Sequence, residues 1–578
     1  MATETDATGS LENVDLSTLL ASVAGSYRQM EMPIPRYVAV IVVPGMLLFV
    51  LSLVAALVLD LPIAVKLPMP LLGVLVLGAA FLYPKIQLDQ RRKRMEEVFH
   101  LYVTHMTVLS TTNIDRVEVF RRIAAEEEYG PLSEETRRIV QLVDTWNQSL
   151  DDSCRMRAKK VPSDPVSDFF DRLAYTINAG ESLSNYLVSE QAAIIQNYST
   201  IYEGQLENLE VMKDLYLSMV LSVTFALVFA TVLPILSGTD PNMTVSAVVV
   251  MYTFIQVGFL YAIYVIAPTD PIWYFPPERT THVERKLQAA TAVGVGLALL
   301  LVVATMVVML GFTGIDPESI PLPIYAAVPT TPLLIPGLVA RQEEADVKKR
   351  DSEYVSFIRA LGSSETAQQT TTTKVLSRLR KKDFGPLTEN IDDLYKRLNM
   401  RLSPEDAWRF FTADAHSYLV QKFSEMYLIG REMGGDPKHL GELISRNMNE
   451  VLQLRERRDQ STTTLIGVIY GISAAATFAF FIGLGIVQVL ATMTTGIGAG
   501  TSSFDFSSLI HTGVYNVGII EYLLTITVLV NSLLSSLIIR VVDGGHKVNS
   551  YMHFVVLTWI TSIIGSITLS LVGALLSV

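Results

Sequence analysis

The sequence is poor in cysteine and in charged residues. Its one cysteine, Cys154, among 578 residues excludes a disulfide framework and any zinc or iron–sulfur site held by cysteine ligands. Charged residues make up 18% of the chain, below the roughly 25% that is usual in soluble proteins. Because 45 Lys and Arg stand against 57 Asp and Glu, the chain also lacks the basic excess that phosphate binding needs, so we expect no nucleic-acid partner.

Motifs for catalysis are also missing. The chain contains no G-x-x-x-x-G-K-[ST] phosphate loop, no G-x-S-x-G nucleophile elbow and no H-E-x-x-H zinc motif. The closest histidines, His100 and His105, are five positions apart, a spacing that does not place them on one face of a helix. We therefore predict a protein that is not an enzyme and that holds no metal and no cofactor.

Long apolar runs are what the sequence does contain. Half of the residues (50%) are hydrophobic, and a membrane helix needs roughly 20 of them in succession. Nine segments are candidates: 38–59, 67–84, 215–236, 244–267, 288–312, 318–340, 464–491, 518–540 and 553–577. The segment 318–340 contains five prolines, and by pattern alone this argues against a regular helix.

Positive charge sets the expected topology. The long segments 85–213 and 341–463 carry most of the Lys and Arg, which places both in the cytoplasm. The short loops hold neither residue (237–243, 313–317 and 492–517). Because two cytoplasmic segments must be separated by an even number of crossings, 318–340 has to count as a span. We expect a multi-pass plasma-membrane protein with its N-terminus inside and its C-terminus outside.

The two cytoplasmic segments repeat each other at an offset of 254 or 255 positions. The matched stretches are Tyr129-Gly130-Pro131-Leu132 with Phe384-Gly385-Pro386-Leu387, Ser149-Leu150-Asp151-Asp152 with Ser403-Pro404-Glu405-Asp406, and Ala179-Gly180-Glu181 with Gly434-Gly435-Asp436. The first pair ends one helix and begins another, and the second is an N-cap with acids in the first helical turn. Between these signals, apolar residues recur at helical spacing.

The sequence therefore predicts an all-α polytopic membrane protein with two homologous cytoplasmic helical-bundle domains. Its expected parts are a polar tail (1–34), a transmembrane hairpin (35–84), the first cytoplasmic domain (85–213), four transmembrane helices (214–340), the second cytoplasmic domain (341–463) and three transmembrane helices (464–578). No strong helix breaker occurs in 182–236 or 437–491. We therefore expect the last helix of each domain to continue into the membrane.

Basic clusters on the cytoplasmic domains are the candidate binding residues. Those beside the membrane are predicted to contact lipid headgroups: Arg91, Arg92, Lys93, Arg94, Lys348, Lys349 and Arg350. Those farther from it are better suited to a protein partner: Arg121, Arg122, Arg155, Arg380, Lys381, Lys382 and Arg409. Arg155 and Arg409 are favoured because they occupy equivalent positions in the two repeats.

This layout resembles the type II secretion F domain family, the integral-membrane platform proteins of type IV pili, type II secretion and the archaeal flagellum. The resemblance is carried by Phe169-Phe170-Asp171-Arg172-Leu173, by Asn178-Ala179-Gly180-Glu181-Ser182-Leu183 and by Gly434-Gly435-Asp436-Pro437-Lys438-His439-Leu440. Within the family it is closest to the archaellum platform proteins of haloarchaeal type, and the acid excess agrees with a salt-loving archaeon.

The resemblance implies a mechanical role without catalytic residues. Such platforms are similar in forming homodimers beneath the filament, with their cytoplasmic domains facing a hexameric secretion ATPase. They are thought to pass the movement of that ATPase to pilin-like subunits (archaellins) in the membrane, and in the archaellum the same machine rotates the filament. These expectations come from the resemblance and not from composition or spacing.

Two alternatives remain open at this point. One is the platform of an adhesive archaeal type IV pilus. The other is a secondary transporter, although transporters carry ionisable groups and polar sites inside their spans. Here Glu521 lies near the outer end of its span and Asn531 is the main polar group at depth. We expect Asn531 to form an interhelical hydrogen bond worth about 1 kcal/mol.

Overall fold

A computed structural model describes residues 33–58, 68–112, 114–277, 279–312, 320–497 and 517–576. The expected polar tail and the expected outer loop 313–317 fall almost entirely outside these ranges. Of the expected outer loop 492–517, residues 492–497 and 517 are described, and they are helical, so the flanking helices extend farther than predicted. Every regular element of the described residues is a helix, and the one β feature among them is an isolated bridge between Trp273 and Ser417. The predicted all-α class is confirmed.

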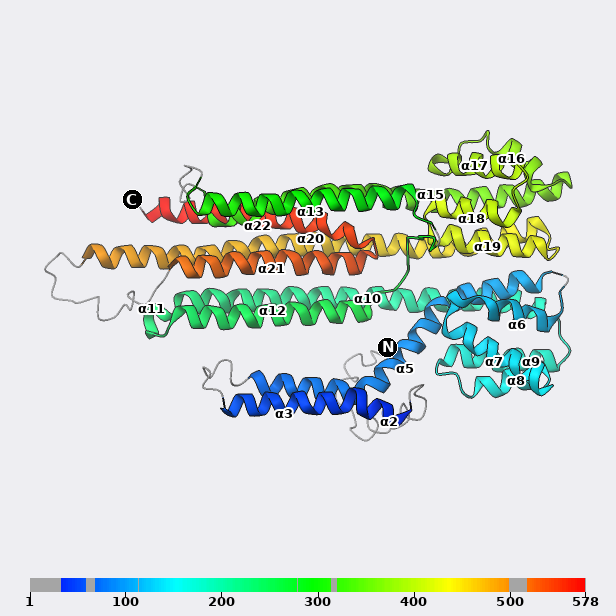
Figure 1. Ribbon diagram of the computed structural model, residues 1–578, viewed down its shortest axis with the longest axis horizontal. Helices are drawn as coiled ribbons and strands as arrows, with labels where there is room; N and C mark the ends of the chain where they lie inside the picture. Colours follow the sequence, from blue (N-terminus) through cyan, green and yellow to red (C-terminus); the bar gives the residue numbers. More distant parts are fainter. Residues whose placement is uncertain are drawn as a thin grey trace, which may run out of the picture. The chain divides into compact units, whose positions relative to one another are not determined.

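Contacts divide the chain into two compact units, and the first comprises residues up to Ser110 and Ile114–Ile194. It contains α2 (Ile34–Tyr37), the π-helical turn η1 (Val38–Val42), α3 (Val43–Val58), α5 (Pro68–Ser110), α6 (Arg116–Ala125), the 3₁₀ turn η2 (Glu127–Tyr129), α7 (Pro131–Trp146), α8 (Leu150–Ala158), α9 (Asp164–Asn178) and the beginning of α10 (Leu183–Val232). Its helices α5 to α9 are drawn in blue and cyan in Figure 1. Its core is rich in aromatic side chains: Phe99 and Phe169 meet edge to face, with ring centroids 5.4 Å apart.

The second unit comprises Thr111–Asn113 and Ile195–Val578. After the rest of α10 it contains α11 (Pro234–Ser237), α12 (Pro241–Ile266), α13 (His282–Met309), α14 (Leu322–Ala327), the 3₁₀ segment η4 (Val328–Leu333), α15 (Leu334–Gln368), α16 (Thr372–Leu379), η5 (Gly385–Leu387), α17 (Thr388–Asn399), α18 (Pro404–Ala415), α19 (Tyr418–Glu432), α20 (Pro437–Ile497), α21 (Val517–Asp543), η8 (Lys547–Asn549) and α22 (Ser550–Leu576).

The duplication is visible in the helices and in their turns. The first repeat folds as α5 to α9 followed by α10, and the second folds as α15 to α19 followed by α20. Gly130 and Gly385 both have φ of 53°, a conformation that favours glycine. The hydroxyls of Ser149 and Ser403 both accept a hydrogen bond from the amide three residues later, at 3.3 and 3.1 Å. The repeat predicted from short sequence matches therefore extends to backbone geometry.

Eight helices of the described residues are long and apolar enough to cross a membrane. They lie within Pro35–Val54, Leu183–Val232, Pro241–Ile266, His282–Met309, Leu322–Gln368, Pro437–Val489, Val517–Asp543 and Lys547–Ala574, and each corresponds to an expected span. The remaining expected span, 67–84, forms the start of α5 and stays a prediction. As expected, α10 and α20 each continue without interruption from a repeat into an apolar segment.

Within the proline-rich segment 318–340, residues 322–340 are helical but irregular, because η4 forms a 3₁₀ stretch between α14 and α15. Neighbouring helices accommodate the prolines. The indole of Trp559 on α22 donates a hydrogen bond to the Thr331 hydroxyl at 3.0 Å. On α13, Gly294 leaves room for Pro336, whose Cδ would lie 2.7 Å from an added Cβ. Within the segment, the Thr330 hydroxyl donates to the Ala327 carbonyl at 2.7 Å. Such side-chain hydrogen bonds help membrane helices to tolerate interior prolines, because they satisfy backbone groups that the prolines leave free.

Asn531 lies at a polar crossing of three membrane helices. On α21, its Oδ1 accepts hydrogen bonds from the Tyr252 hydroxyl at 2.8 Å and from Gln256 Nε2 at 2.5 Å, both on α12. Its Nδ2 donates to the Ser473 hydroxyl on α20 at 3.1 Å. The expected interhelical hydrogen bond is confirmed. Because all four residues are buried, the network favours one register of these helices.

Candidate coupling site at the base of the second repeat

Arg455 is the centre of a buried ionic cluster on α20, shortly before the expected start of the span 464–491. Its guanidinium binds Asp270 twice, with Nε–Oδ2 of 2.6 Å and Nη2–Oδ1 of 2.8 Å. It also donates from Nη1 to Asp351 Oδ2 at 2.8 Å and from Nη2 to the Pro271 carbonyl at 2.9 Å. Asp270 follows α12 and Asp351 lies on α15, so one side chain fastens three segments of the chain.

The loop after α12 also pairs through its backbone with the second repeat. Tyr274 N donates to the His416 carbonyl at 2.9 Å, and Tyr418 N donates to the Ile272 carbonyl at 3.1 Å. Between these bonds, the Ser417 hydroxyl donates to Asp351 and also accepts from the Val420 amide as the N-cap of α19. The turn between α18 and α19 is thereby joined to the loop and to α15.

His416 closes this part of the cluster. Its Nε2 lies 2.8 Å from the Thr281 hydroxyl, and its Nδ1 lies 2.9 Å from the Asp414 carbonyl. Burial lowers the pKa of His416. The imidazole is therefore neutral at neutral pH and acts as a hydrogen-bonding group, not as a charge.

An aromatic cluster attaches the loop between α21 and α22 to the same place. Trp273 stacks on Phe275 with ring centroids 5.5 Å apart, and both rings contact the ring of His546. Glu344 on α15 accepts from Trp273 Nε1 at 3.1 Å and from the His546 amide at 2.9 Å. One carboxylate thus binds the loop after α12 and the loop after α21 together.

Arg458, one turn after Arg455 on α20, holds the end of α21. Its Nε donates to the Val542 carbonyl at 2.7 Å, and its Nη2 donates to the Val541 carbonyl at 3.3 Å. Gly544 follows with φ of 72°, and an added Cβ there would lie 2.6 Å from the guanidinium. The positive φ therefore favours glycine at this position, and an added Cβ would also displace the Arg458 guanidinium.

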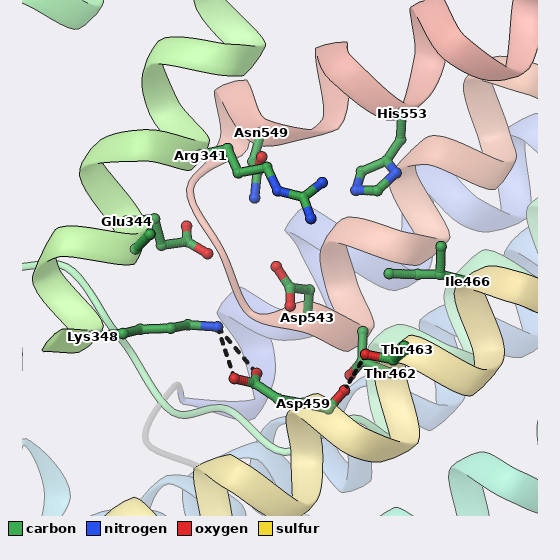
Figure 2. Close-up of a pocket in the computed structure, with 11 residues that line it drawn as sticks. Arg341, Glu344, Lys348, Asp459, Thr462, Thr463, Ile466, Asp543, Asn549 and His553 are labelled. Carbon is green, nitrogen blue, oxygen red and sulfur yellow. Dashed lines mark hydrogen bonds and ion pairs between the residues drawn. The ribbon is translucent and has the colours of Figure 1, made fainter. Parts of the chain in front are cut away.

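A polar pocket of about 230 Å³ adjoins the cluster (Figure 2). Its charged lining residues are Arg341, Glu344, Lys348, Asp459 and Asp543. Lys348 Nζ pairs with Asp459 at 3.0 Å. Because the lining mixes both signs of charge, it suits ordered water better than a ligand of one charge. Among the described residues no group of three or more His, Cys, Asp or Glu could hold a metal ion.

The first repeat has a different buried cluster. The position equivalent to Arg455, 254 residues earlier, is Ile201, which cannot form such a cluster. Instead, the buried Glu135 on α7 accepts from Arg157 Nε on α8 at 2.9 Å and pairs with Arg91 on α5 at 3.5 Å. The first cluster therefore holds helices of one repeat together, whereas the Arg455 cluster joins a repeat to the loop after α12.

The residues predicted to bind a protein partner are paired with acids of their own repeat. The pairs are Arg155 with Asp152 at 3.9 Å, Arg409 with Asp406 at 3.0 Å, Arg121 with Asp144 at 2.7 Å, Arg122 with Glu118 at 3.1 Å and Arg380 with Asp392 at 2.9 Å. Lys381 and Lys382 follow in the turn after α16. Local pairs at exposed sites contribute little to stability, whereas Arg380 is half-buried and also lies over the ring of Tyr395. Contact with a protein partner stays a prediction for this set.

The residues predicted to bind lipid headgroups also have protein contacts. Arg91 is mostly buried beside Glu134 and Glu135, and Arg350 donates to the Ala415 carbonyl. Four others form ion pairs: Arg92 with Glu96, Lys93 with Glu97, Lys348 with Asp459 and Lys349 with Asp346. Arg94 lies on the same helix as Arg91. Contact with lipid stays a prediction for this set. Lys348 also lines the pocket beside the Arg455 cluster.

Arg455 is not among the candidate residues predicted from the sequence, although it begins a basic run that ends at Arg458. A signal was present, because the apolar stripe of α20 includes Met448, Val451 and Leu452, and Arg455 occupies the next position on that buried face. A charge on a buried face needs a partner. The identity of that partner, Asp270, required the fold.

Comparison with known proteins places these features in context. Residues 102–231 match the family model described as Type II secretion system (T2SS), protein F. The chain is 34% identical over 514 residues to Flagella accessory protein J of Methanococcus voltae, covering 87% of this chain and 90% of that protein. It is 33% identical over 512 residues to Flagella accessory protein J of Methanocaldococcus jannaschii, covering 88% and 90%. No solved structure matches the chain.

Proposed function

Since the chain belongs to the family of flagella accessory protein J, we propose that it is the membrane platform through which a cytoplasmic hexameric secretion ATPase drives assembly of archaellum subunits. The ATPase acts on the two cytoplasmic repeats. The repeats pass this movement to the membrane helices, from which pilin-like archaellins are extracted, and the same movement rotates the filament. The platform is a homodimer of haloarchaeal type, with its N-terminus inside and its C-terminus outside, and it hydrolyses no ATP itself.

The observation that carries this proposal is the attachment of α20. A single helix, Pro437–Ile497, is part of the second repeat and of a candidate membrane span. Where it leaves the repeat, Arg455 binds the loop after α12 and Arg458 binds the end of α21. A force on the repeat therefore acts on several membrane helices through short, buried contacts. Flexible connections would dissipate the same force.

The alternatives have less support. The polar groups around Asn531 are hydrogen-bonded to one another, which suits helix packing better than the midplane binding site of a transporter. The curated relatives are named for flagella, which favours an archaellum over an adhesive pilus.

A deletion strain and an affinity purification test the proposal together. We expect the deletion to abolish swimming and leave surface adhesion intact, and the full-length gene to restore swimming. We also expect the tagged, detergent-extracted chain to retain the hexameric ATPase from the same membranes. A strain that swims normally but no longer adheres would assign the chain to an adhesive pilus. Uptake of a substrate by the purified protein in vesicles would favour a transporter.

A further inference from the structure

Large apolar side chains are seldom exposed in the two cytoplasmic repeats. Within the described residues of 85–182 and 341–436, which leave out the long helices α10 and α20, the exposed ones are Trp146, Met156, Tyr175, Met400 and Leu402. Trp146, Met400 and Leu402 lie where one helix of a repeat ends and the next begins, whereas Met156 lies on α8 and Tyr175 lies on α9. Isolated exposed apolar residues need no explanation, but a large exposed one at the same turn of both repeats does.

Trp146 and Met400 occupy equivalent positions of the two repeats, 254 residues apart. Each is 73% exposed. Each is followed by a residue in the left-handed conformation, Asn147 with φ of 52° and Arg401 with φ of 62°. The N-cap serine of the following helix, Ser149 or Ser403, lies two residues after this left-handed residue. Both repeats therefore present a large apolar side chain directly before a left-handed residue at the end of a helix, and we name this position the apolar corner.

The helix after each apolar corner carries an exposed arginine at an equivalent position. Arg155 is paired with Asp152, and Arg409 is paired with Asp406, in both cases three residues earlier on the same helix. Tryptophan, methionine and arginine are enriched where proteins bind each other. The combination fits an acceptor surface that has an apolar pocket and acidic residues at its rim.

We propose that Trp146 and Met400 are the anchors by which the two repeats dock on two subunits of one homo-oligomeric ATPase. This inference rests on the proposed function. Two apolar corners at equivalent positions of the repeats fit a partner that presents the same pocket more than once. A symmetric oligomer does so, whereas a monomeric partner offers one copy of each surface. Because both contacts then form within one complex, each raises the effective concentration for the other.

The test measures binding of the purified ATPase of the same organism to the full-length chain in detergent. The variants are Trp146→Ala, Met400→Ala and the double substitution, and the matched control is Tyr175→Ala. Tyr175 is equally exposed, but its equivalent in the second repeat, Ile429, is only partly exposed. Since the substituted side chains are exposed, we expect all variants to elute and unfold as the wild type does.

Each single substitution at a corner is expected to weaken binding about 10-fold. The double substitution should weaken it at least 100-fold, and Tyr175→Ala should leave it unchanged. Binding of the double variant within 2-fold of the wild type would overturn the docking assignment while leaving the proposed function intact. A loss at only one corner would overturn the two-subunit arrangement. Dissociation of the chain's own dimer in the double variant would identify a second copy as the occupant. No ATPase binding by the wild type would overturn the proposed function as well.

Discussion

Arg455 and Asp270 are 185 positions apart in the sequence and form a two-pronged ion pair in which both side chains are 8% exposed. Asp270 lies just beyond α12, and Arg455 lies on the helix shared by the second repeat and the membrane bundle. The pair therefore connects two candidate membrane helices at the ends that adjoin the second repeat. Its burial makes it sensitive to the loss of either partner, because the remaining charge would have no compensation.

Arg455→Ala is expected to destabilise the protein by about 3–5 kcal/mol, because it leaves Asp270 and Asp351 buried without a cation. Swimming should be lost even in cells where the protein is still inserted in the membrane. Arg455→Lys should restore part of the stability, since an ammonium keeps the charge but cannot bind Asp270 in the same two-pronged way. Thermal unfolding in detergent and a swimming assay measure both effects.

Arg457→Ala is the matched control, because Arg457 lies on the same helix and its side chain is 55% exposed. It pairs with Glu203, and an exposed pair of this kind is worth at most about 1 kcal/mol. Equal destabilisation by Arg455→Ala and Arg457→Ala would show that the burial of the Arg455 cluster has no special mechanical or energetic role.

Features that depend on neighbouring residues could be predicted from the sequence. The apolar runs located the spans, and the Ser149 and Ser403 caps located two helix starts, because hydrophobic length and capping are local properties. The duplication followed from turn signals in the same order. In these respects the fold agrees with expectation, because each of these features depends on the residues of a single segment.

Features that depend on distant segments could not be predicted in this way. Nothing near Arg455 identifies Asp270 as its partner, since only the fold brings them together. The five prolines of 318–340 likewise gave no indication that Gly294 and Trp559 accommodate the 3₁₀ segment. For the candidate site, the sequence therefore indicated basic residues but not which of them are buried.

Thiol labelling tests the expected topology. Burial raises the pKa of the Cys154 thiol, and the side chain is enclosed, so the native cysteine should stay unreactive. We expect Thr239→Cys to react with a membrane-impermeant maleimide in intact cells, because 237–243 is predicted to lie outside. Ala367→Cys should react only after lysis. Both positions are exposed. Labelling of Ala367→Cys in intact cells would show that the topology is the reverse of the one predicted.

Asn531→Leu is expected to reduce stability by about 1–2 kcal/mol, because it leaves Tyr252 and Gln256 without their shared acceptor inside the membrane bundle. Thr305→Ala is the control, since that hydroxyl bonds only to carbonyls of its own helix. The midpoints of thermal unfolding in detergent compare the two variants. An unchanged midpoint for Asn531→Leu would mean that the polar crossing does not hold α12 and α21 in register.

Gly337→Ala tests the close approach of α15 to α22. An added Cβ at Gly337 would lie 2.6 Å from the backbone nitrogen of Met552, and backbone cannot move aside as a flexible side chain can. The two helices must separate, at a cost of about 1–3 kcal/mol. Gly296→Ala on α13 is the control, because no atom lies within 4 Å of an added Cβ there. In that open position alanine should be neutral or slightly stabilising, since it favours the helix. An unchanged unfolding temperature for Gly337→Ala would show that α15 and α22 do not approach each other this closely at Met552.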